Sequence, residues 1–167
     1  LYNLLKIPRN LIYYSRALEQ ACRIYLKTKD YERVQELFGE LRGVVFEELE
    51  LKKWADTLMV ESFANLIDEI KRTILNIMSE KLINALKDMH KCLHKSFLII
   101  EENIEKIKIL RGYGRVSTLL ADVLWKTTNF DDAYSVLDTS ISFIQENLNQ
   151  LPDIPDKYLV KLHLFNM

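Results

Sequence analysis

The side chains best suited to chemistry in this sequence are two histidines and a cysteine close together, His90, Cys92 and His94. His90 and His94 are four residues apart, so on a helix they share one face and could both reach a metal ion. A tetrahedral zinc site needs two further ligands, and Cys92 points to another side of the helix. The one remaining histidine is His163. We therefore interpret this cluster as the edge of an amphipathic helix and expect no metal or other cofactor.

A pair of acids, Asp131 and Asp132, is the second candidate for chemistry. A magnesium–diphosphate site would need a third acid one helical turn later, and none follows there. Acids in the first turn of a helix are favoured by the amide dipoles, so we expect this pair to open a helix after Asn129. The sequence has no phosphate-binding loop, dinucleotide-binding loop, nucleophile elbow or C-x-x-C motif. Gly112-Tyr113-Gly114 is interpreted as a turn, and no catalytic constellation is predicted.

The composition limits the class of protein. A chain of 167 residues, 49% of them hydrophobic, fits one domain spanning residues 1–167. The 23 basic and 24 acidic side chains nearly balance, which argues against nucleic-acid binding and against a basic membrane-surface patch. No apolar run is long enough to insert into a membrane. The two cysteines fit a reducing, cytoplasmic setting. Because no initiator Met is present, we expect a fragment of a longer chain.

The candidate residues all lie in segments with helical periodicity. Residues 45–110 contain no Gly or Pro, and no segment alternates like a strand. The sequence therefore predicts an all-α fold. We expect helices over residues 10–28, after Asp30 as N-cap, over 51–78, 80–110, 115–126 and 130–148, and from 156 onward, with a break at Pro152 and Pro155.

The long central segment, residues 51–110, leaves two readings open. Apolar residues continue at a step of four through Ser79, which fits one uninterrupted helix. Such a helix would be about 90 Å long at about 1.5 Å per residue, more than a compact domain can cover, so we favour a turn near Ser79. We expect Trp54 and Leu58 to face inward. In the preceding helix, Gly39 and Gly43 are expected to let another helix approach closely, with a helix break as the alternative.

Two stretches share a pattern of large and small side chains around a turn. In each, a large and a small residue lie together on one helix, an aromatic residue follows the turn, and a small or β-branched residue comes three positions later. The first stretch is Leu18-(x2)-Ala21-Cys22-(x2)-Tyr25-(x5)-Tyr31-(x2)-Val34-(x3)-Phe38, and the second is Leu120-Ala121-(x2)-Leu124-(x5)-Phe130-(x2)-Ala133-(x3)-Leu137. Small residues let the two helices of a hairpin pack closely, and the aromatic residue fills the turn.

This pattern resembles the tetratricopeptide (TPR) repeat, a helix-turn-helix unit of about 34 residues. The resemblance covers residues 16–42 and 117–144. The two matches do not lie a multiple of 34 residues apart, and the helices between them are longer than TPR helices. The resemblance therefore implies an antiparallel helical-hairpin array, a TPR-like α-solenoid segment, with one enlarged central hairpin.

The resemblance also implies a non-enzymatic scaffold or adaptor segment that binds a peptide or a partner subunit. In TPR-type arrays the first helix of each hairpin lines the concave face, so the expected binding residues are Arg16, Glu19, Arg23, Lys27, Arg115, Thr118, Asp122 and Lys126. Both sets begin with Arg and end with Lys, which suits a carboxylate or an acidic peptide. The alternatives are a plain solvated face, the effector-sensing domain of a regulator, and a helical enzyme fragment lacking its catalytic part.

Overall fold

The computed structural model describes residues 11–52, 57–153 and 155–164, and within these ranges every regular element is an α-helix. The all-α prediction is therefore confirmed for the described residues. The helices are α1 (Leu11–Thr28), α2 (Tyr31–Lys52), α3 (Thr57–Ile99), α4 (Asn103–Lys126), α5 (Phe130–Gln150) and α6 (Pro155–Leu164). None of these described helices combines the length and apolar character needed to cross a bilayer.

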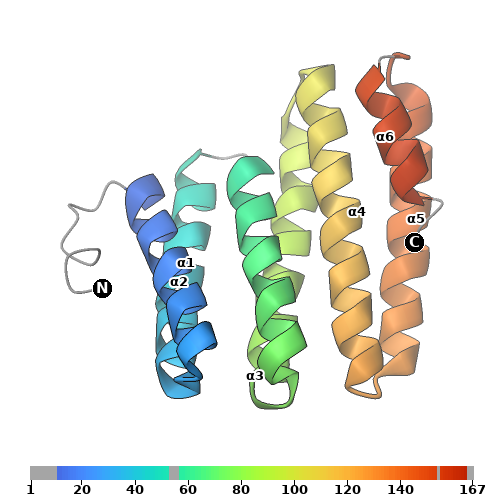
Figure 1. Ribbon diagram of the computed structural model, residues 1–167. Helices are drawn as coiled ribbons and strands as arrows, with labels where there is room; N and C mark the ends of the chain where they lie inside the picture. The colour runs from blue at the N-terminus through green and yellow to red at the C-terminus, as the bar shows by residue number, and fades with distance from the viewer. Residues whose placement is uncertain (1–10, 53–56, 154, 165–167) are drawn as a thin grey trace.

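The helices lie side by side in two layers (Figure 1). The front layer holds α1, the first part of α3, α4 and α6, and the back layer holds α2, the second part of α3 and α5. Within this arrangement α1 packs on α2, α3 on α4, α4 on α5, and α6 on α4.

α3 belongs to both layers because it reverses direction at Ile74, whose backbone (φ −141°, ψ 36°) leaves the helical region. The sequence predicted this turn near Ser79, about one helical turn later, and the reading as one uninterrupted helix is wrong. Leu58 was expected to face inward and is 73% exposed, and Ile77, just beyond the reversal, is 48% exposed. The reversal changes which side of the helix meets the core, so one apolar stripe cannot be followed through it.

α3 and α4 are separated by a break at Ile100–Glu102, a segment that contains no Gly or Pro. Glu102 is extended (φ −72°, ψ 121°) and forms the N-cap of α4. The prediction of one helix through 110 is therefore wrong, as is the prediction of a turn at Gly112-Tyr113-Gly114. Those three residues are buried inside α4, and a Cβ added at Gly112 would lie 3.7 Å from Leu93. Gly112 thus lies at the contact between α4 and α3, where a Cβ would make an ordinary van der Waals contact.

The turns of the α1–α2 and α4–α5 hairpins have the same geometry. Each contains a residue in the left-handed region, Lys29 (φ 62°) or Thr128 (φ 64°). The next residue, Asp30 or Asn129, donates its backbone N–H to the carbonyl five residues earlier, at 3.0 Å and 2.9 Å. This is the hydrogen bond of a Schellman-type helix end. The same turn therefore occurs at equivalent positions of the two stretches that share the sequence pattern.

The spacing of the hairpins differs from 34 residues. Side chains that meet between α2 and α3, such as Gln35 and Lys81, are 46 residues apart in sequence. Those that meet between α3 and α4, such as Asn65 and Arg115, are 50 apart. These two sequence separations, one from α2 to α3 and the other from α3 to α4, together account for most of the distance in sequence between the two matching stretches.

The core lies between the two layers, and apolar residues of the first matching stretch contribute to it. Leu18 and Cys22 on α1 are fully buried, and Phe38 on α2 stacks on Phe63 of α3 with ring centroids 5.4 Å apart. Gly39 and Gly43 contradict the prediction of a close approach, since both are exposed and a Cβ added to either would meet nothing within 4 Å. Trp54 lies outside the described residues.

Candidate partner-binding face

The eight predicted binding residues lie on α1 and α4, which flank the first part of α3 in the front layer (Figure 1). On α1, Arg16 and Lys27 are exposed, Arg23 is partly exposed, and Glu19 is only 7% exposed. On α4, Lys126 is exposed, and Arg115, Thr118 and Asp122 are half-buried. The structure therefore brings both sets to one side of the molecule, with α3 between them.

The α1 set is connected to α3 through Glu19 and Arg23. Arg23 Nη1 lies 2.5 Å from Glu19 Oε1, and its Nε donates to Glu69 Oε1 of α3 at 3.0 Å. Ser62, also on α3, donates to Glu19 Oε2 at 2.6 Å. Glu19 is thus an internal acid with two partners, and its role is to hold α1 against α3.

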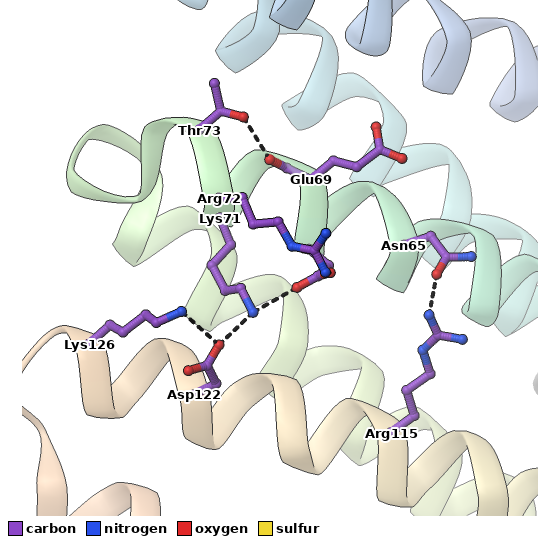
Figure 2. Close-up of polar contacts among 9 residues, drawn as sticks. Asn65, Glu69, Lys71, Arg72, Thr73, Arg115, Asp122 and Lys126 are labelled. Carbon is purple, nitrogen blue, oxygen red and sulfur yellow. Dashed lines mark hydrogen bonds and ion pairs between the residues drawn. The ribbon is translucent and has the colours of Figure 1, made fainter.

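The α4 set is connected to the other side of α3 (Figure 2). Arg115 donates to the side-chain oxygen of Asn65, while Thr118 Oγ1 donates to the Gly114 carbonyl of its own helix at 2.9 Å. Asp122 lies between two lysines, with its Oδ2 2.5 Å from Lys71 Nζ and 3.2 Å from Lys126 Nζ. The candidate face is therefore a network that spans three helices.

The Lys71–Asp122 pair sets the charge state at the centre of this network. Burial raises the pKa of Asp122, but hydrogen bonds from Lys71 and Lys126 outweigh that effect and the pKa is lowered. For Lys71, burial lowers the pKa and the carboxylates of Asp122 and Asp68 raise it, with a net rise. Both groups are consequently charged at neutral pH, and each stabilises the charged form of the other.

The contribution of α3 to this face was missed by the sequence reasoning. Its polar residues follow a helical stripe, and they are Ser62, Asn65, Glu69 and Arg72. That spacing of three and four was visible in the sequence and would have marked the stripe. It was overlooked because the resemblance identified only the two outer hairpins.

A surface hollow of about 350 Å³ lies between α1 and α3 at the end of this face. Three basic side chains, Arg23, Lys27 and Arg72, contribute to its lining together with one acid, Glu69. Arg72 is paired with Asp68, whereas the described residues offer no ion-pair partner to Lys27. Arg23 is itself paired with Glu19 and Glu69, so Lys27 is the basic side chain of the lining that can bind an anionic group without displacing an acid of the described residues.

A second cavity, of about 430 Å³, opens between α1, α2 and the first part of α3. Its apolar wall includes Leu41, Val45 and Phe63, and its polar wall includes Arg16 and the buried carboxylate of Glu19. This combination of an apolar surface with a few fixed polar groups is typical of small-molecule sites.

The histidines take part in helix packing. The ring of His90 lies 4.1 Å from that of Tyr113, centroid to centroid, and its Nε2 is 3.1 Å from Ser140 Oγ. Burial, with a smaller effect of His94, lowers the pKa of His90 to about 4. Among the described residues no group of three or more His, Cys, Asp or Glu side chains has a metal-binding arrangement. His90 and His94 therefore belong to the contact between α3, α4 and α5.

Comparisons with protein-family models, with curated proteins and with solved structures found no match to this chain.

Proposed function

We propose that this chain is a non-enzymatic, cytoplasmic scaffold or adaptor segment that binds a peptide or partner subunit. The binding surface is the face formed by α1, the first part of α3 and α4. The observation that carries this proposal is the convergence of the two predicted residue sets on either side of α3, beside a hollow lined by three basic side chains.

The proposal includes a TPR-like array with an enlarged central hairpin. Two observations support it. The α1–α2 and α4–α5 turns share the left-handed residue and the same backbone hydrogen bonds at equivalent positions. α3 doubles back at Ile74 between these hairpins and thus supplies a third pair of helical segments. In such an arrangement the front layer presents the first helix of each hairpin to a partner.

The partner we propose is acidic. Arg16 and Lys27 are exposed and have no ion-pair partner among the described residues, so an incoming carboxylate can bind them without displacing an internal acid. Arg23 and Arg115 are already held by α3, which fixes their guanidinium groups in place. Positioned guanidinium groups bind carboxylates with less loss of side-chain entropy than mobile ones.

The test is binding of a fluorescein-labelled oligo-glutamate peptide, measured by fluorescence anisotropy. The front-face variant carries Arg16→Glu and Lys27→Glu, which replace two exposed residues. The matched control carries Lys91→Glu and Lys95→Glu, two exposed positions on the second part of α3. We expect the front-face variant to bind at least tenfold more weakly and the control to differ less than twofold. Equal weakening in both, with circular dichroism showing intact folds, would contradict the proposal.

The second cavity supports one alternative function, the effector-sensing domain of a regulator. Its volume of about 430 Å³ and the buried carboxylate of Glu19 in its wall suit a small molecule with a polar end and an apolar body. A thermal-shift screen of small molecules tests this alternative. A ligand that stabilises the wild type but not Leu41→Phe, which adds bulk to the cavity wall, would favour it over the peptide-binding function.

A further inference from the structure

Three exposed aromatic rings gather around the α4–α5 turn. Trp125 is 49% exposed, Phe130 44% and Tyr134 62%. Trp125 meets the other two edge to face, with centroids 4.8 Å from Phe130 and 5.6 Å from Tyr134. Single exposed apolar residues are ordinary on a protein surface, but contiguous aromatic groups are typical of interaction sites.

The matching positions of the first hairpin are less exposed. Because the two turns are equivalent, Leu26 corresponds to Trp125 and Gln35 corresponds to Tyr134. Leu26 is only 8% exposed, and Gln35 accepts a hydrogen bond from Lys81 on the second part of α3 at 3.1 Å. In the α4–α5 hairpin, α6 packs on α4 in the front layer, but no described helix lies beside α5 in the back layer, where the second part of α3 would correspond (Figure 1). The rings of Trp125, Phe130 and Tyr134 remain exposed.

The charge of α5 indicates what would occupy the place. This helix of 21 residues carries Asp131, Asp132, Asp138 and Glu146 and no Lys or Arg. Asp131 precedes Tyr134 by three residues and Asp138 follows it by four, so both lie on the same stripe of the helix. Both are exposed, and neither has an ion-pair partner among the described residues.

We propose that the outer side of the α4–α5 hairpin binds a basic amphipathic helix of a partner protein. The apolar side of that helix packs on Trp125 and Tyr134, and its Lys and Arg side chains lie beside Asp131 and Asp138. Cations also bind favourably over the faces of exposed aromatic rings. The incoming helix takes the position that the second part of α3 takes beside α1 and α2. This surface is separate from the face proposed above and selects the opposite charge.

The test uses a fluorescein-labelled leucine–lysine peptide, with leucines at helical spacing so that one side is apolar, and anisotropy as the readout. A leucine–glutamate peptide of the same spacing tests charge, and a scrambled leucine–lysine peptide tests helical amphipathicity. We expect the leucine–lysine helix to bind at least tenfold more tightly than either control. Affinity should also fall with added salt, because exposed ion pairs are screened.

Variants then locate the site. We expect Trp125→Ala and Asp138→Lys each to weaken binding at least tenfold. The matched control Glu146→Lys makes the same charge change on α5, about three turns beyond Tyr134, and should change affinity less than twofold. If Trp125→Ala lowers the helical content, Tyr134→Ala replaces it, since that side chain is more exposed. The proposal is overturned if the leucine–lysine helix does not bind, if the scrambled peptide binds equally, or if Glu146→Lys weakens binding as much as Asp138→Lys.

Discussion

Replacing Gly39 and Gly43 by alanine should stabilise this protein. Both glycines lie inside α2, are exposed, and have no positive φ that would require glycine. A Cβ added at either position would meet nothing within 4 Å. The substitutions therefore add no clash, and they remove conformational freedom that the unfolded chain loses on folding.

The expected gain follows from helix propensity. Alanine is more favourable than glycine in a helix interior by about 0.8–1 kcal/mol per residue. No new contact is made at either site, so the two effects should add, and the double variant should gain about 1.5–2 kcal/mol in unfolding free energy. For a chain of this size each kcal/mol raises Tm by about 2–4 °C, which predicts a rise of about 3–8 °C.

Urea unfolding followed by circular dichroism measures this gain. The slope of unfolding free energy against urea should stay the same in all variants, because the buried surface does not change. Lys87→Ala, at an exposed position of α3, is the control for introducing alanine without removing glycine, and it should change stability by less than about 0.5 kcal/mol. If the variant with both glycines replaced by alanine is no more stable than wild type, this reasoning is refuted. A loss of stability would show that another surface packs closely on these glycines.

Two further predictions concern the turn residues and His90. Thr128→Gly should stabilise the protein by about 1 kcal/mol in urea unfolding, because a β-branched residue is strained at φ 64°. Lys29→Gly should give a smaller gain. If Thr128→Gly lowers the stability instead, the threonine side chain contributes more than its backbone strain costs. The pKa of His90 is lowered to about 4 in the folded state, so the unfolded chain binds the proton first as pH falls, and wild type should lose stability between about pH 6.5 and pH 4. After allowance for the partial exposure of His90, this loss of unfolding free energy is about 1–2 kcal/mol, and it should be absent in His90→Gln. Thermal unfolding of both proteins across that pH range measures it. If the stabilities of wild type and His90→Gln change in parallel with pH, the lowered pKa of His90 is wrong.

The sequence by itself determined the helical class and the elements at the two ends of the chain. Glycine and proline are scarce, and apolar residues recur at helical spacing, so backbone propensity and burial favour the same structure. Asp30 was identified as an N-cap, and its Oδ1 accepts the backbone N–H of Arg33 at 3.3 Å. Pro152 and Pro155 marked the break between α5 and α6. These features depend on neighbours within a few residues, which a sequence displays directly.

The sequence also placed the eight candidate binding residues on two helices but could not show what lies between them. Helical spacing puts Arg16 to Lys27 on one stripe and Arg115 to Lys126 on another. Their pairing with Glu69, Asn65 and Lys71 joins residues 46 to 51 positions apart. Such contacts depend on which helices become neighbours, and no local pattern specifies that.

Only the tertiary structure decided where the central segment turns. The chain reverses at Ile74 and breaks at Ile100–Glu102, although neither place contains a residue that disfavours a helix. Gly112 and Gly114, which do disfavour one, lie inside α4. The local preferences at these sites amount to about 1 kcal/mol each, whereas burying one large apolar side chain contributes about 1.5–3 kcal/mol. Packing of α3 against both neighbouring hairpins buries many such side chains, and so it outweighs the local preference at each turn.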